Sequence, residues 1–145
     1  MIRKLTIALG ACWAIGAGIA AVTAANASEP TYDDRREIAC SIIARHDRDG
    51  DGQLNIFEAR RAGKAAFKTL NGDRDLTLEY DEVADRIDPD TFDKYDRIKW
   101  RGLDRGEWTR LVKDRFRAAA DGDRTVGCDQ LFTREGRRLL AVIWY

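Results

Sequence analysis

Residues 47–58 (DRDGDGQLNIFE) hold four acidic side chains and two glycines. Three of the acids, Asp47, Asp49 and Asp51, alternate along the chain, so their like charges repel one another at short range. The stretch has too few apolar residues to be held in place by burial of its own side chains. The sequence therefore predicts a loop whose acidic groups need a compensating partner.

The spacing of these acids, D-x-D-x-D-G-x5-E, is typical of a loop that surrounds a divalent cation with oxygen atoms. Side chains at loop positions 1, 3 and 5 point inward, and Glu58 at position 12 closes the ring with both carboxylate oxygens. Gly52 at position 6 supplies the backbone conformation of a sharp turn. The predicted ligands of this segment, loop 1, are Asp47, Asp49, Asp51, the backbone carbonyl of Gln53, Asn55 and Glu58.

At these positions the chain resembles the EF-hand superfamily, and in particular the calmodulin-like calcium-binding proteins found outside the cytoplasm of bacteria. The resemblance implies paired helix–loop–helix units that bind Ca²⁺. Hard oxygen ligands in a flexible ring suit Ca²⁺, whereas Mg²⁺ needs a tighter octahedron and keeps its water. Leu54 at position 8 is expected to pair with a second loop as a short β-bridge.

The same template recurs at residues 71–82 (NGDRDLTLEYDE), which we term loop 2. It departs from the pattern at position 6, where Leu76 replaces glycine. We expect Leu76 to be forced into the glycine conformation at a cost of about 1 kcal/mol. The predicted ligands of loop 2 are Asn71, Asp73, Asp75, the backbone carbonyl of Thr77, Glu79 and Glu82.

A third copy, loop 3 (residues 96–107), keeps the frame but not the ligands. Leu103 and Glu107 fall at positions 8 and 12, yet positions 3 and 5 are Ile98 and Trp100. Neither of these side chains coordinates a hard cation. Loop 3 is therefore predicted to be a structural scaffold.

A fourth copy, loop 4 (residues 119–130), places Val126 at position 8 but has Ala119 and Gln130 in place of the two end ligands. A register that begins at Asp121 instead is no better, because it puts an aromatic residue at position 12. Loop 4 is not expected to bind Ca²⁺ strongly. The four loops begin about 24 residues apart, which indicates one repeated unit.

Apolar residues with a helical period predict helices around the loops, so the expected fold class is all-α. One helix covers residues 32–46, with Ile38, Ala39, Ile42 and Ile43 on its buried side. A second joins loops 1 and 2 and has Gly63 as the one place where it can bend. Asp88-Pro89 ends one helix and begins the next, with Asp88 as the N-cap, and Thr133 is expected to cap the last helix.

The predicted array divides the mature chain at this Asp88-Pro89 break. Residues 28–87 form two metal-competent EF-hands, and residues 88–145 form two degenerate ones. Loop 1 is expected to pair with loop 2, and loop 3 with loop 4. A continuous helix of twelve residues between loops 1 and 2 opposes this pairing, because it would hold them about 18 Å apart.

The first 27 residues predict a secretory signal peptide, with Arg3 and Lys4 before a long apolar run and a cleavage site after Ala27. Two alternatives are an uncleaved membrane anchor and a lipoprotein signal at Cys12, which the apolar residues after Cys12 disfavour. A signal peptide places the protein in the periplasm or outside the cell.

Cys40 and Cys128 are the cysteines of the mature chain. In an oxidising compartment they form a disulfide, and otherwise they are buried free thiols. Without residues 1–27 the chain has 23 basic and 25 acidic residues. This balance does not suggest a nucleic-acid partner or an anionic membrane surface.

An enzyme is not expected, because the chain has one histidine, His46, and no nucleophile, phosphate-loop or zinc motif. The predicted function is Ca²⁺ binding by an exported protein that acts as a sensor or a buffer. As a sensor it would bind a protein partner. In the alternative, Ca²⁺ only stabilises the fold, and the C-terminal half binds a protein partner through Trp100, Trp108 and Trp144.

Overall fold

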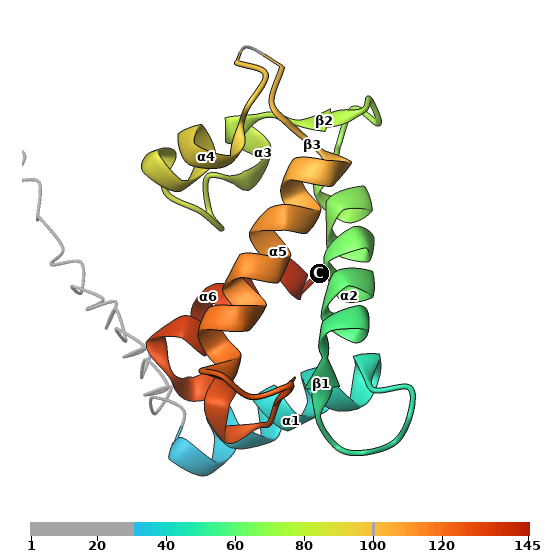
Figure 1. Cartoon of the computed structure of the whole chain (residues 1–145), viewed down its shortest axis with the longest axis vertical. Coiled ribbons are helices and arrows are strands. Elements are labelled where there is room, and N and C mark those ends of the chain that lie inside the picture. The colour runs from blue at the N-terminus through green and yellow to red at the C-terminus, as the bar shows by residue number, and fades with distance from the viewer. Residues whose placement is uncertain (1–30, 100) are drawn as a thin grey trace, which may run out of the picture.

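The computed structural model describes residues 31–99 and 101–145, and this part of the chain is mostly helical, as an all-α fold requires (Figure 1). Its elements are α1 (Tyr32–His46), β1 (Leu54–Asn55), α2 (Ile56–Leu70), β2 (Thr77–Leu78), α3 (Tyr80–Val83), α4 (Pro89–Tyr95), β3 (Leu103–Asp104), α5 (Arg105–Ala120), β4 (Thr125–Val126), the 3-10 helix η1 (Asp129–Phe132) and α6 (Arg134–Ile143). The predicted signal peptide and Trp100 lie outside the described residues. None of the described helices is long and apolar enough to cross a membrane.

The helices begin where the sequence supplies N-caps. Asp88 accepts a hydrogen bond from the Thr91 N–H and is followed by Pro89 in the first turn of α4, as predicted. Thr133 caps α6 by accepting from the Gly136 N–H, which confirms the second predicted cap. Side-chain caps of this kind satisfy backbone N–H groups that have no partner inside the helix.

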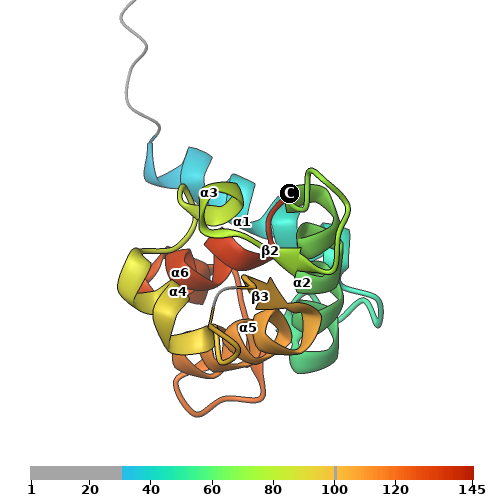
Figure 2. The same cartoon turned by 90° about the horizontal axis from the view of Figure 1, so that it is seen from above.

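The two longest helices, α2 and α5, lie side by side and antiparallel, with a pair of strands at each end (Figure 1). At one end β1 pairs with β4, so that Leu54 lies opposite Val126. At the other end β2 pairs with β3, so that Leu78 lies opposite Leu103 (Figure 2). Position-8 residues therefore form the predicted β-bridges, but loop 1 pairs with loop 4 and loop 2 with loop 3.

The expected pairing of loop 1 with loop 2 is wrong because α2 is continuous. A helix of 15 residues is about 22 Å long and keeps the loops at its two ends apart. Helix α5 separates loops 3 and 4 in the same way. One buried cluster contains residues from both sides of the Asp88-Pro89 break, so the two predicted halves share a core.

Gly63 lies in the middle of α2, where the helix runs on without ending. The residue instead allows α5 to approach closely: a Cβ added to Gly63 would lie 2.6 Å from a methyl carbon of the buried Val112. The indole N–H of Trp108 donates to the Gly63 carbonyl at 2.9 Å. Trp108 is 1% exposed, which contradicts its predicted place on a contact surface.

Helix α1 is attached to the second half of the chain by a disulfide between Cys40 and Cys128. The free-thiol alternative is therefore wrong. Ala39, Ile42 and Ile43 are buried as predicted, but Ile38 is 47% exposed.

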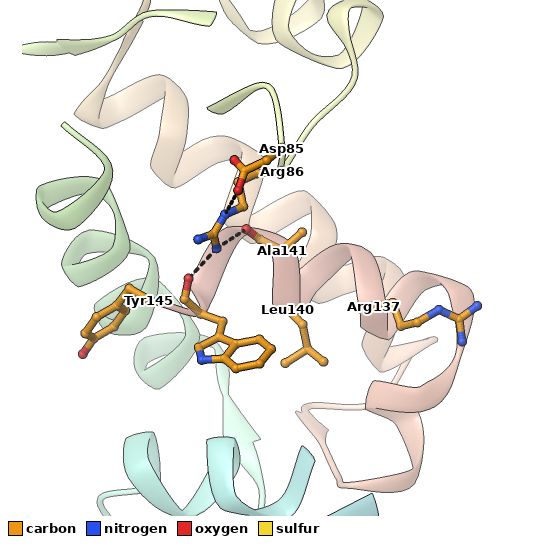
Figure 3. A pocket seen from close by; sticks show the side chains of 7 residues that line it. Asp85, Arg86, Arg137, Leu140, Ala141 and Tyr145 are labelled. Atoms are coloured by element: carbon orange, nitrogen blue, oxygen red, sulfur yellow. Dashed lines mark hydrogen bonds and ion pairs between the residues drawn. The ribbon is translucent and has the colours of Figure 1, made fainter. Parts of the chain in front are cut away.

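The C-terminal residues are held by Arg86, which follows α3. Its guanidinium donates to the carbonyl of Trp144 at 2.7 Å and to that of Ala141 at 3.4 Å (Figure 3). A cation at the C-terminus of α6 also interacts favourably with the helix dipole. The end of the chain is thereby fixed beside α3, with Trp144 half exposed.

We expect Gly63→Ala to destabilise the wild-type protein by about 1–2 kcal/mol, since overpacking against Val112 outweighs the helix preference for alanine. In a Val112→Ala background the same substitution should be stabilising, because the new methyl group then fills space. Urea unfolding of the four proteins measures both effects. Equal effects of Gly63→Ala in the two backgrounds would show that the helices are not in contact here.

The disulfide joins residues 88 positions apart, so it restricts the unfolded chain strongly. Cys40→Ser/Cys128→Ser should lower the free energy of unfolding by about 2–5 kcal/mol. The wild type in reductant should unfold at the same denaturant concentration as this variant. An unfolding midpoint that reductant leaves unchanged would contradict the bond.

Candidate metal centre

Loop 1 brings three of its predicted ligands together. One carboxylate oxygen from each of Asp47, Asp49 and Glu58 lies within 4.8 Å of the others. Asp51 is not part of this group, and its carboxylate accepts from the Gln53 N–H at 2.8 Å. The loop thus brings together negatively charged side chains from its first and last positions.

The carboxylate of Asp47 is stabilised by the loop backbone. Its two oxygens accept hydrogen bonds from the N–H groups of Gly50 at 2.7 Å and Gly52 at 2.9 Å. The Gly52 bond is the main reason why the pKa of Asp47 lies below its ordinary value. Both glycines have positive φ angles, 76° and 75°, which a residue with a Cβ adopts at a cost. Glycine at these positions lets the loop turn its N–H groups inward.

Glu58 closes loop 1 and lies in the first turn of α2. Its two oxygens accept from the N–H of Arg48 at 2.6 Å and of Asn55 at 2.9 Å, and the residue is 4% exposed. Asn55 in turn caps the helix and donates from Nδ2 to Asp49 at 3.2 Å. The sequence pattern placed Glu58 correctly but not the two backbone donors that orient it.

The side chain of Gln53 points to the neighbouring loop, where its Oε1 accepts from the Thr125 hydroxyl. Only its backbone carbonyl was predicted as a ligand, so this contact leaves the prediction untested. The bond does connect loops 1 and 4 beside the β1–β4 pair.

Loop 2 gathers Asp73, Glu79 and Glu82, which each place one carboxylate oxygen within 4.8 Å of the others. Glu82 accepts from the Gly72 N–H at 2.7 Å and the Glu79 N–H at 3.2 Å, repeating the geometry of Glu58. Burial raises the pKa of Glu79 above its ordinary value. A bound cation would offset this cost, because it favours the ionised carboxylate.

Asn71 and Asp75, the other two predicted side-chain ligands, are hydrogen-bonded to each other at 3.4 Å, and the carboxylate of Asp75 is not part of the three-carboxylate group. Asn71 is 6% exposed, and its Nδ2 donates to the carbonyl of Thr77 at 2.6 Å. The carboxylate of Asp75 accepts from the Thr77 N–H at 2.7 Å. The Thr77 carbonyl thus faces position 1 of the loop, as its predicted role as a ligand requires.

The backbone of loop 2 corrects one expectation. Leu76 does not have the positive φ predicted for position 6; among the non-glycine residues of this loop it is Arg74, at φ 64°, that does. Loop 2 therefore turns at position 4 alone, whereas loop 1 has two glycines with positive φ. Leu76 avoids the strain and is 75% exposed.

All four loops share one hydrogen bond, from the backbone N–H at position 9 to the side chain at position 12. The donor–acceptor pairs are Asn55–Glu58, Glu79–Glu82, Asp104–Glu107 and Gly127–Gln130, at 2.9, 3.2, 3.0 and 2.7 Å. This contact, together with the strand register, confirms the register that begins loop 4 at Ala119. It also shows that the frame of the loop persists where the ligands do not.

The degenerate loops fill their interiors differently. In loop 4, Gln130 donates from Nε2 to Asp123 at 3.1 Å, so an amide nitrogen lies where loops 1 and 2 have a second carboxylate oxygen. In loop 3, Asp96 is 5% exposed, and its Oδ1 has no hydrogen-bond partner. Lys99 donates to the carbonyl of Asp93 and forms an ion pair with its carboxylate.

The residues of loops 1 and 2 fit a divalent cation. Each loop offers three convergent carboxylates and further oxygen donors, the ligand type that Ca²⁺ takes. In loop 2 the buried Oδ1 of Asn71 has no partner, while its Nδ2 points at the Thr77 carbonyl. Turning that amide over would direct two oxygens at the loop interior, an arrangement that a bound cation would satisfy.

No family model matches this chain, and no curated protein matches it. The presence of a metal centre is therefore inferred from the residues of loops 1 and 2 alone.

Asn71→Asp should lower the free energy of unfolding by about 1–3 kcal/mol in chelator, because a buried carboxylate would face the Thr77 carbonyl without a donor between them. With Ca²⁺ the loss should shrink or reverse, since a carboxylate is a stronger ligand. Urea unfolding in both buffers measures this. The matched control, Asn55→Asp, should lose less, because aspartate is also a good helix cap. An unchanged stability of Asn71→Asp in chelator would contradict the geometry.

Proposed function

We propose that this protein is an exported Ca²⁺-binding protein of the EF-hand type, with one metal site in loop 1 and another in loop 2. The observation that carries the proposal is the convergence of three carboxylates in each of these loops. The same convergence is not seen among the described residues of loops 3 and 4, whose sequences lack the ligands.

Two further observations support an EF-hand arrangement. Each loop is followed by a helix or a helical turn, and position-8 residues of different loops pair as antiparallel strands. The position-12 side chain binds the backbone at position 9 in every copy, which preorganises Glu58 and Glu82 for a ligand. Pairing of a metal-competent loop with a degenerate one puts the two sites at opposite ends of α2.

Ca²⁺ is favoured over Mg²⁺ by the number and variety of oxygen donors. Each loop offers carboxylates, a backbone carbonyl and an amide side chain within twelve residues, and Ca²⁺ accepts six to eight such ligands in irregular geometry. Backbone N–H groups donate to these carboxylates and help to hold them close together. Binding would replace this repulsion by attraction, so it would also stabilise the fold.

In the alternative, Ca²⁺ acts only as a structural ion and the C-terminal half binds a partner. Of the three tryptophans expected on that surface, Trp108 is buried and Trp144 is about half exposed. The exposed Phe57 and Leu76 are residues of loops 1 and 2 themselves, within residues 28–87. These positions favour a Ca²⁺-dependent surface near loops 1 and 2.

Calorimetric Ca²⁺ titration of residues 28–145 should show two sites. Asp47→Ala should remove the loop 1 site and Glu82→Gln the loop 2 site, because each substitution takes away a convergent carboxylate. The control Asp90→Ala removes an exposed acid outside the loops and should leave both sites intact. Absence of heat with the wild-type protein, or sites that survive both loop substitutions, would refute the proposal.

The fluorescence of a hydrophobic dye, measured with the same proteins, distinguishes a Ca²⁺ sensor from a Ca²⁺-stabilised structural module. A sensor should bind more dye when Ca²⁺ is added, because it exposes apolar surface. A structural module should bind the same amount or less. The sensor role would be refuted by dye fluorescence that does not rise with Ca²⁺.

A further inference from the structure

Helices α2 and α5 form a pair that is covered on one side by α6. On another side, a groove runs between the two helices. Its middle is a depression of about 320 Å³ between Arg60, Lys64 and Arg105, and a second of about 200 Å³ continues it toward loop 2. Phe67 and Arg105 line both depressions, so the two adjoin each other.

The walls of this groove are basic. Arg60, Lys64 and Lys68 recur every four residues along α2, and all three are exposed. Arg105 comes from the facing helix, with its guanidinium carbon 5.9 Å from the centre of the Phe67 ring. Arg74 of loop 2 lines the same end. None of these five cations forms an ion pair within the described part of the chain.

Toward loops 1 and 4 the groove becomes partly apolar. A depression of about 590 Å³ there is lined by Ile56, Phe57 and Phe116, by Arg117 and Arg124, and by three acids, Asp49, Asp51 and Asp123. Phe57 is 73% exposed, one of the largest exposures of any apolar side chain in the described residues. The acids at this end belong to loops 1 and 4, so the middle of the groove remains basic.

We propose that the groove binds an extended acidic segment of a partner protein, with an apolar side chain of that segment against Phe57. Arginine forks and lysine ammonium groups on both walls complement carboxylates spaced along a peptide. Five cations in one row repel one another, and Asp75 is the one acid among the residues that line the two depressions, so an acidic partner relieves that repulsion.

Other anionic partners fit the groove less well. Single-stranded nucleic acid binds through successive bases stacked on several aromatic rings, but of the four aromatic residues that line the depressions only Phe57 is exposed, whereas Phe67, Trp108 and Phe116 are 3%, 1% and 4% exposed. A flat membrane surface does not reach into a groove between two helices. An acidic polysaccharide has no large apolar side chain to place against Phe57.

The length of the groove sets the length of the probe. Helix α2 has 15 residues and spans about 22 Å, which an extended peptide covers with about seven residues. A suitable probe is therefore a fluorescein-labelled peptide of about seven residues, five glutamates with a leucine at each end. Its binding is followed by fluorescence anisotropy.

The wild-type protein should bind this peptide, and Lys64→Glu/Arg105→Glu should weaken binding about tenfold or more. The control Arg110→Glu/Arg134→Glu changes the net charge equally, but Arg110 lies on α5 near Tyr95 of α4, away from the groove. It should bind nearly as tightly as the wild type. Phe57→Ser should weaken binding of the leucine-containing peptide but not of an all-glutamate peptide.

Each variant is compared with the wild type in Ca²⁺ and in chelator, so that the result does not depend on whether the loops bind metal. The milder variant Lys64→Gln/Arg105→Gln, checked by circular dichroism, replaces the charge reversal if that protein does not fold. Equal losses in the groove and control variants would overturn the proposal, as would no binding by the wild type. Tighter binding of a thymidine oligonucleotide, anionic vesicles or a sulfated polysaccharide than of the peptide would also overturn it.

Discussion

The close contact between Gly63 and Val112 is the constraint on which the rest of the structure depends. Because α2 lacks a side chain at this point, α5 packs directly against its backbone, and the Trp108 indole bonds to the Gly63 carbonyl. Two rigid antiparallel helices held this way bring loop 1 to loop 4 and loop 2 to loop 3. Gly63 and Val112 are also equivalent residues of the repeat, being separated by 49 positions as Asp47 and Asp96 are.

The fold separates acidic groups from basic groups, a separation that the balanced net charge of the chain does not show. Acidic groups gather in the loops at the two ends of α2, while basic groups line the groove between α2 and α5. The balanced net charge did not suggest a basic surface, because it averages over both regions. Metal binding at the ends of α2 would make the whole face more positive, so the two proposed activities would reinforce each other.

The parts of the site that the sequence predicted lie within twelve residues of one another, although Asp51 and Asp75 of the same loops are not in the three-carboxylate groups. The spacing of Asp47, Asp49 and Glu58 sufficed, because the turns that bring them together are encoded by the intervening glycines. The positive φ predicted for Leu76 was wrong. The prediction assumed a fixed turn at position 6 of the loop, but Arg74 at position 4 takes the strained conformation instead. Which residue of a loop absorbs the strain is decided by the whole loop.

The sequence by itself determined the helices, their caps, the register of the loops and the convergence of acidic residues, since these follow from contacts between near neighbours in the chain. Only the tertiary structure decided which loops pair, that Cys40 bonds to Cys128, and that Trp108 is buried. It also decided which cations of α2 and α5 face a common groove. These features depend on how two rigid helices pack, and the decisive contact joins residues 49 positions apart, beyond the reach of any local pattern.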